Sequence, residues 1–294
     1  MADPAAVSAP LSQPLSHLRA EAAASRLPPL VVAAERVANT VMQGVHGRRR
    51  SGHGDAFWQF RPYTPGDAAS AVDWRQSAKA DRLFVRETEW EAAQTVLLWR
   101  DPSPSMRWRS GKNLEEKAAR ADLLLLALAS LLLRGGERVR LVGDRQAFMG
   151  RSALPALAAA MARSAPAEAE DATAPRHARL VMFGDFLQPL AGLQAMLSRQ
   201  AAKPLRGQML QILDPAEESL PYSGRIRFDG LEGEGSLLVP RVETIRGLYA
   251  ERLAAHRDGL STMARAAGWG FSTHLTDQPP HLALLSLWQA LAPA

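Results

Sequence analysis

From residue 94 onward, short apolar runs alternate with longer stretches in which apolar residues recur every three or four positions. The apolar runs have the length of strands and read QTVLLW, RVRLVG, RLVMF and QMLQIL. The stretches between them, at 110–136, 152–164 and 189–201, have the periodicity of helices. Strands that alternate with helices predict an open α/β domain, with a mainly parallel, doubly wound sheet covered on both faces.

After residue 214 the pattern changes before it returns to the same alternation. The stretches GRIRFDG and SLLVP predict two short strands that form a hairpin, a small β insertion near 222–240. A helix is expected over 241–268, a last strand over 269–275 and a last helix over 280–292. We therefore expect one α/β domain that covers residues 93–294.

The part of the chain before this domain has a different character. Residues 1–26 are rich in Ala, Pro and Ser, which predicts a loose N-terminal segment. An amphipathic helix is expected to follow, on the spacing of Leu30, Ala34, Val37 and Val41. Residues 46–90 combine turn formers, charges and aromatics without a sustained period, and the aromatics argue against disorder. Residues 27–92 are therefore predicted to be a helical and irregular extension of the domain.

The composition of the chain argues for a globular protein and against several other classes of protein. The chain has 294 residues, of which 47% are hydrophobic and 22% charged, as in globular proteins, and it has no cysteine for disulfides or thiolate metal sites. Its formal charge of +5 is modest, and the tight basic run at 48–50 reads as a loop, so nucleic-acid binding is not expected. The longest apolar run, 123–133, is far shorter than the roughly 20 residues of a membrane span. We expect a cytoplasmic protein that reaches the inner membrane only through partners.

Two aspartates are predicted to meet at one edge of the sheet. Asp101 follows the strand QTVLLW and Asp185 follows RLVMF, and ligands of open α/β sheets bind at the carboxyl ends of strands. Ser103 and Ser105 lie on the loop beside Asp101, and carboxylates with hydroxyls suit Mg²⁺ or Mn²⁺. The alternative is structural, because each of these residues is also common in turns and helix caps.

Residues 101–105 resemble the D-x-S-x-S motif of the metal-ion-dependent adhesion site (MIDAS) in von Willebrand factor A domains. The upstream stretches FRPYTPGD, VDWRQSAK and LFVRETE resemble the signature of the bacterial family called domain of unknown function 58, as does 212–230. The resemblance implies a von Willebrand factor A-like, Rossmann-like fold. It also implies a cation ligated by Ser103 and Ser105, held by Asp101 and Asp185, and completed by a hydroxyl for which Ser152 is the positional candidate.

Three neighbours of the motif depart from the pattern of such sites. Arg100 places a permanent positive charge next to the predicted cation, which opposes binding unless the side chain points away. Pro102 and Pro104 stand where smaller residues are usual, and they remove two backbone donors. These departures predict a metal site that is weak or lost.

The upstream signature also carries a cluster of charged and aromatic side chains. The cluster could be a docking surface for a partner, or a paired polar network that pins an irregular segment. Its members are Arg61, Asp67, Asp73, Trp74 and Arg86.

No HxH or HExxH spacing and no phosphate loop of the G-x-x-x-x-G-K-[ST] form occurs in the chain, so a catalytic site is not predicted. The family resemblance instead implies a non-enzymatic adaptor that works with a MoxR-type AAA+ ATPase in protein remodelling or maturation. Other proteins with von Willebrand factor A domains are further expected partners. The alternative is a Mg²⁺- or Mn²⁺-dependent hydrolase that holds its metal through Asp101 and Asp185.

Overall fold

The structure is a computed structural model that describes residues 28–43, 57–65, 67–80, 82–88, 93–163, 175, 177–203 and 205–291. The chain divides into two compact units. The larger unit comprises residues 1–42 and 94–294, and the smaller unit comprises residues 43–93. The N-terminal segment 1–26, the basic run at 48–50 and most of the loop at 164–176 lie outside the described residues.

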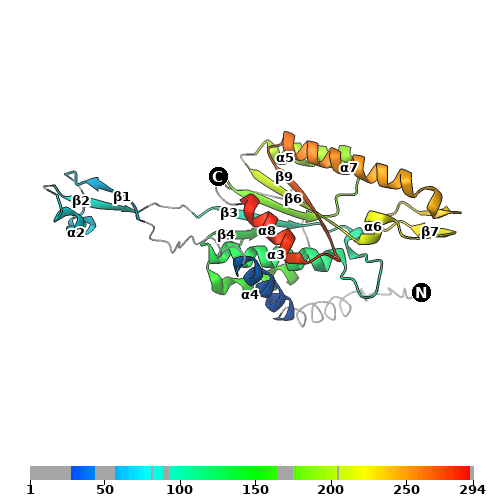
Figure 1. Cartoon of the computed structure of the whole chain (residues 1–294), viewed down its shortest axis with the longest axis horizontal. Coiled ribbons are helices and arrows are strands. Elements are labelled where there is room, and N and C mark those ends of the chain that lie inside the picture. Colours follow the sequence, from blue (N-terminus) through cyan, green and yellow to red (C-terminus); the bar gives the residue numbers. More distant parts are fainter. Residues whose placement is uncertain are drawn as a thin grey trace, which may run out of the picture. The chain divides into compact units, whose positions relative to one another are not determined.

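The larger unit is built on a five-stranded parallel sheet, as the alternating pattern predicts (Figure 1). The strands follow one another in the spatial order β4-β3-β5-β6-β9. The central strand β5 is buried at every position, which is why its sequence is a continuous apolar run and not an alternating one. The strands are β3 (Thr95–Arg100), β4 (Arg138–Leu141), β5 (Arg179–Gly184), β6 (Arg206–Leu213) and β9 (Gly270–Leu275).

Helices cover both faces of this sheet, so the chain has the predicted mixed α/β, Rossmann-like architecture (Figure 1). One face carries α3 (Lys117–Arg134), α4 (Leu154–Arg163) and α8 (Pro280–Leu291). The other face carries α5 (Leu190–Ala201) and α7 (Arg246–Ala266), which pack on a core that includes Trp99, Met182 and Trp269. Among the described residues, none of the helices is long and apolar enough to cross a membrane.

The helix over 28–43 belongs to the larger unit, whereas the sequence pattern predicts it as part of the extension at 27–92. Ala34, Ala38 and Val41 are buried, and they recur at the spacing of one helix face. Arg134 of α3 donates a hydrogen bond to Asn39 Oδ1 at 2.5 Å. The apolar stripe therefore reflects packing within the larger unit.

The smaller unit is a two-stranded antiparallel sheet with a short helix, where the sequence pattern predicted only an irregular segment. Strand β1 (Phe57–Pro62) pairs with β2 (Phe84–Thr88), and Val85 is buried. The 3₁₀ helix η1 (Ala69–Ala71) and the helix α2 (Trp74–Ser77) lie between the strands in the chain. Turns and short strands of this kind leave no helical period in the sequence.

Several short elements lie between the main helices and strands. Strands β7 (Ile226–Asp229) and β8 (Ser236–Val239) pair antiparallel, which agrees with the predicted hairpin. Helix α3 begins at Lys117 and not near Ser110, because residues 110–114 form bends and a turn. The other short elements are the helix α6 (Pro215–Ser219) and the 3₁₀ helices η2 (Pro104–Arg107), η3 (Arg151–Ala153) and η5 (Val242–Thr244).

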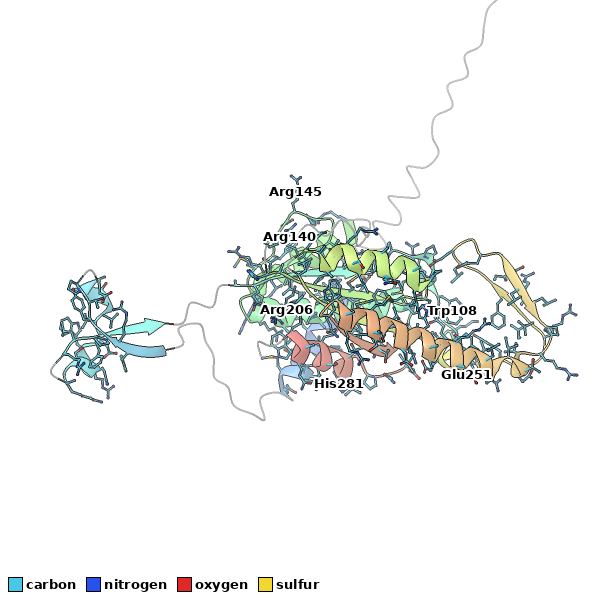
Figure 2. All side chains as sticks on the ribbon, turned by 90° about the horizontal axis from the view of Figure 1, so that it is seen from above. Trp108, Arg140, Arg145, Arg206, Glu251 and His281 are labelled. Atoms are coloured by element: carbon cyan, nitrogen blue, oxygen red, sulfur yellow. The ribbon has the colours of Figure 1, made fainter. Side chains whose placement is uncertain are left out.

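The strand order reverses between β3 and β5, and this reversal positions the candidate site. The chain passes from β3 to β4 on one side and then returns to β5 on the other side of β3. Loops that leave neighbouring strands in opposite directions open a crevice at the carboxyl ends, where ligands of such sheets bind. Trp108 follows β3 and η2, and Arg206 begins β6. Figure 2 shows these two residues toward opposite ends of the sheet.

Candidate functional site

Asp101 and Asp185 lie side by side at the crevice because their strands are neighbours in the sheet. Asp101 N donates to Phe183 O at 2.8 Å, which continues the pairing of β3 with β5 past the end of the strand. Ser103 N donates to Asp101 Oδ1 at 2.8 Å and closes a tight turn. A Cβ atom at Gly184 would lie 2.8 Å from Asp101 Oδ2, so a larger residue before Asp185 would force the Asp101 side chain to shift.

The two serines of the motif connect the first strand to Asp185. Ser103 Oγ lies 3.0 Å from Ser105 Oγ, and Ser105 Oγ donates to Asp185 Oδ2 at 2.7 Å. Pro104 begins the short helix η2, a position that suits the fixed φ of proline. The structure thus brings together four of the predicted residues. Ser152 is exposed on η3, and no hydrogen bond of the described residues joins it to these four.

A lysine that the sequence analysis did not single out completes this group. Lys117 Nζ donates to Asp185 Oδ2 at 2.8 Å and to Glu217 Oε1 at 2.6 Å, and its side chain is 0% exposed. Burial alone lowers the pKa of Lys117, but the negative charges of Asp185 and Glu217 outweigh it and raise the pKa above the ordinary value. The side chain is therefore an ammonium ion in contact with two carboxylates.

The start of α6 fixes Glu217 in place. Asp214 caps the helix by accepting from Ala216 N at 2.8 Å, and Glu217 Oε2 accepts from Asp214 N at 2.9 Å, which together form a capping box. The buried carboxylate of Asp214 also accepts from Ser110 N at 2.9 Å and Ser110 Oγ at 2.5 Å. These bonds join the loop after β3 to the turn after β6.

Further hydrogen bonds hold Asp185 from the side of α7. Gln211 Nε2 donates to Asp185 O at 2.8 Å, and Arg257 Nε donates to Gln211 Oε1 at 3.1 Å. The next residue, Phe186, has a φ of 49°, which is uncommon for a side chain of this size. The His256 ring lies 2.7 Å from Phe186 O, so α7 supports this conformation directly.

Arg100 does not place its charge on the carboxylates at the crevice. Its guanidinium donates to Asp122 Oδ1 at 2.6 Å and to Met161 O at 2.7 Å, on the side of α3 and α4. The arginine is therefore paired within the α3 face of the sheet. The sequence suggested that the charge of Arg100 would repel a cation at the crevice, but in these contacts the charge is paired with Asp122 instead.

The positions of the donors decide how well a divalent cation fits. Asp185 Oδ2 already accepts hydrogen bonds from Ser105 Oγ and Lys117 Nζ. A divalent ion bound to that oxygen would meet an ammonium ion at close range, and like charges repel strongly in a buried site. In this arrangement the side chains do not fit a divalent cation bound directly by Asp185 and Ser105, and metal binding by the protein stays a prediction.

In the smaller unit, two of the predicted docking residues form an ion pair. The two terminal guanidinium nitrogens of Arg61, Nη1 and Nη2, each donate to Asp67 at 2.6 Å, and Thr64 N donates to Asp67 Oδ2 at 2.8 Å. These hydrogen bonds hold the pKa of Asp67 well below its usual range. They form a paired polar network, which is the alternative to a docking surface that the sequence leaves open.

The remaining residues of that set lie on α2 and β2. Asp73 caps α2 by accepting from Gln76 N at 2.8 Å, and Trp74 is 66% exposed. Arg86 lies in β2 opposite Phe60, and its side chain is outside the described part of the unit. A role of this unit in docking stays a prediction.

Sequence reasoning missed Lys117 and Glu217, although the sequence carried a signal for the lysine. Lys117 shares a helix face with Ala121, Leu124 and Leu128, which are all buried. A lysine on an apolar stripe, at a helix start where acidic residues are favoured, indicates a buried partner. Glu217 follows Asp214 at the spacing of a capping box, which predicts a local role and gives no sign of Lys117.

Asp101 is expected to make stability depend on pH. Burial, with a smaller contribution from Asp185, raises the pKa of Asp101 to about 6. The folded state then binds more protons than the unfolded state between about pH 4 and pH 6, so stability falls as the pH rises through this window. Relative to Asp101→Asn, the wild type should lose about 2 to 3 kcal/mol of unfolding free energy from pH 4 to pH 7. Urea unfolding of both proteins in a chelator measures this difference, and parallel pH profiles would contradict it.

Comparison with known proteins places the chain in a family. A search of the curated proteins found no match. Among solved structures, a conserved hypothetical protein, BatB from Bacteroides thetaiotaomicron, aligns at 13% identity with a TM-score of 0.35, covering 68% of this chain and 97% of that one. The model of the family described as "Protein of unknown function DUF58" matches residues 59–259, from the smaller unit to α7. Because this match spans more than half of the sequence, the chain belongs to the DUF58 family.

Proposed function

We propose that this protein is a non-catalytic interaction module, an adaptor that works with a MoxR-type AAA+ ATPase in protein remodelling or maturation. The main support is the bonding at the crevice, where Asp185 is neutralised by a fully buried ammonium and accepts from Ser105. Lys117 and Asp185 are paired with each other, so neither is poised to exchange a proton with a substrate as general acid–base catalysis requires. The crevice has the character of a rigid recognition surface.

The placement of the D-x-S-x-S loop supports a von Willebrand factor A-like domain as the form of this module. The loop leaves β3 at the point where the strand order reverses, and Asp185 leaves the neighbouring strand β5. In open α/β sheets this is the position at which ligands bind. We therefore propose the rim of the crevice as the docking face for the ATPase or for another von Willebrand factor A-domain protein.

An exposed leucine beside Asp185 allows a direct test, and an exposed leucine on α8 serves as the comparison. Leu187, two residues after Asp185, is 37% exposed, and Leu282 on α8 is 55% exposed. In pull-down and titration experiments with the MoxR-type ATPase of the same organism, we expect Leu187→Arg to weaken binding about tenfold, which corresponds to the loss of about 1.4 kcal/mol. Leu282→Arg adds the same charge elsewhere and should bind as the wild type does.

Failure of the wild-type protein to bind the ATPase, or to change its rate of ATP hydrolysis, would contradict the adaptor function. Equal weakening by both arginine variants would place the docking face elsewhere on the molecule.

A Mg²⁺- or Mn²⁺-dependent hydrolase stays the alternative prediction. Such an enzyme would need Asp101 and Asp185 to hold a metal ion that activates water. The contact of Lys117 with Asp185 does not favour this function. Metal-dependent turnover of a phosphoester or peptide substrate would distinguish the hydrolase from the adaptor.

A further inference from the structure

Lys117 occupies a position that local helix preferences do not explain. It is the first residue of α3, where the positive end of the helix dipole favours acidic side chains, and the first turn of this helix has none. Lysines are almost never fully buried unless they are paired, and this one is 0% exposed. The reason for a lysine here must therefore lie in its tertiary contacts.

The contacts of the ammonium join segments that are distant in the chain. Asp185 follows β5 and lies 68 residues from Lys117, and Glu217 on α6 lies 100 residues from it. Ser105, from the loop after β3, donates to the same oxygen of Asp185 as Lys117 does. One positive charge thus joins the segments after β5 and β6 directly, and the loop after β3 is joined to them through the bond of Ser105 to Asp185.

We propose that the Lys117 ammonium is the resident cation of the D-x-S-x-S cluster, and that it takes the place of a divalent metal ion there. The lysine stem is buried under the loops, so Nζ cannot move into solvent without opening the packing at the start of α3. A divalent ion at Asp185 and Ser105 would have to displace this charge. The wild-type protein therefore binds no divalent cation at the cluster.

The test compares Mn²⁺ binding by the wild type and by Lys117→Met, which removes the charge and keeps an unbranched apolar stem. Binding is counted by electron paramagnetic resonance of free Mn²⁺, and the melting temperature is recorded with and without millimolar Mn²⁺. We expect no bound Mn²⁺ and no change in melting temperature for the wild type. Lys117→Met should melt several degrees lower than the wild type, bind one Mn²⁺ per chain and recover part of the lost melting temperature.

Lys112→Met serves as the matched control, because Lys112 is exposed on the loop before α3 and the same charge is removed. This variant should behave like the wild type. One Mn²⁺ per wild-type chain, lost in Asp185→Asn, would overturn the proposal, as would a folded Lys117→Met variant that binds none. If Lys117→Met does not fold without metal, the wild-type titration decides: no binding supports a resident ammonium, and binding that depends on Asp185 overturns it.

Discussion

Replacing Lys117 with methionine is expected to lower the free energy of unfolding by about 3–5 kcal/mol, the range found when one partner of a buried ion pair is removed. The substitution leaves the carboxylates of Asp185 and Glu217 without the ammonium that lies 2.8 Å and 2.6 Å from them. Buried charges without a partner are far more costly than buried hydrogen-bonded ones. Urea unfolding at neutral pH in a chelator measures the loss.

The same experiment can separate the missing charge from the changed packing. Neutralising the partners as well, in Lys117→Met/Asp185→Asn/Glu217→Gln, should restore much of the lost stability, because no uncompensated charge remains. Lys112→Met should change the unfolding free energy by less than about 0.5 kcal/mol, as exposed substitutions do. A loss of under about 1 kcal/mol in Lys117→Met would show that the buried contacts contribute little.

The second large effect is expected at Trp269, which precedes β9 and lies over the start of β6. Its side chain is 3% exposed and packs in the core between the sheet and helices α5 and α7. Truncation of a buried tryptophan removes a large apolar area and leaves a cavity. Trp269→Ala should therefore lower the free energy of unfolding by about 3–5 kcal/mol in denaturant titrations.

A double-mutant cycle tests the specific contact that places this ring. A Cβ atom at Gly207 would lie 1.9 Å from Trp269 Cδ2, so Gly207→Ala forces the ring to move. We expect this substitution to cost about 1–3 kcal/mol in the wild type and almost nothing once Trp269 is alanine. Gly192→Ala, at an exposed helical site with open space, should be neutral or slightly stabilising. Additive losses in the double variant would exclude the predicted coupling.

The sequence was sufficient to predict the architecture of the larger unit because each helix and strand has its own characteristic spacing of apolar residues. The continuous apolar runs at β3 and β5 are typical of strands buried on both faces, and the structure confirms the parallel sheet. Once β3 and β5 are neighbours, the meeting of Asp101 and Asp185 follows from the direction of the strands. The juxtaposition was therefore predictable, whereas the metal ion that the carboxylates and hydroxyls suggest stays a prediction.

The remaining features depend on contacts between distant residues, which no local pattern records. Helix α3 begins at Lys117 and not near Ser110, and Ser110 is instead bonded to Asp214, 104 residues further along the chain. The partner of Lys117 on α6 was hidden for the same reason, since Glu217 follows a local capping pattern. The small β1–β2 sheet was missed because its strands are short and joined by turns.

Helix α3 is buried on almost every side, since fourteen of its eighteen residues have little contact with solvent. A helix enclosed by the sheet and by other helices cannot tilt or slide without breaking a close-packed interior. The loops anchored to its first turn are consequently held in one shape before any partner arrives. Binding at such a surface loses little conformational entropy, so the rate of encounter, and not a slow rearrangement, should limit how fast complexes form.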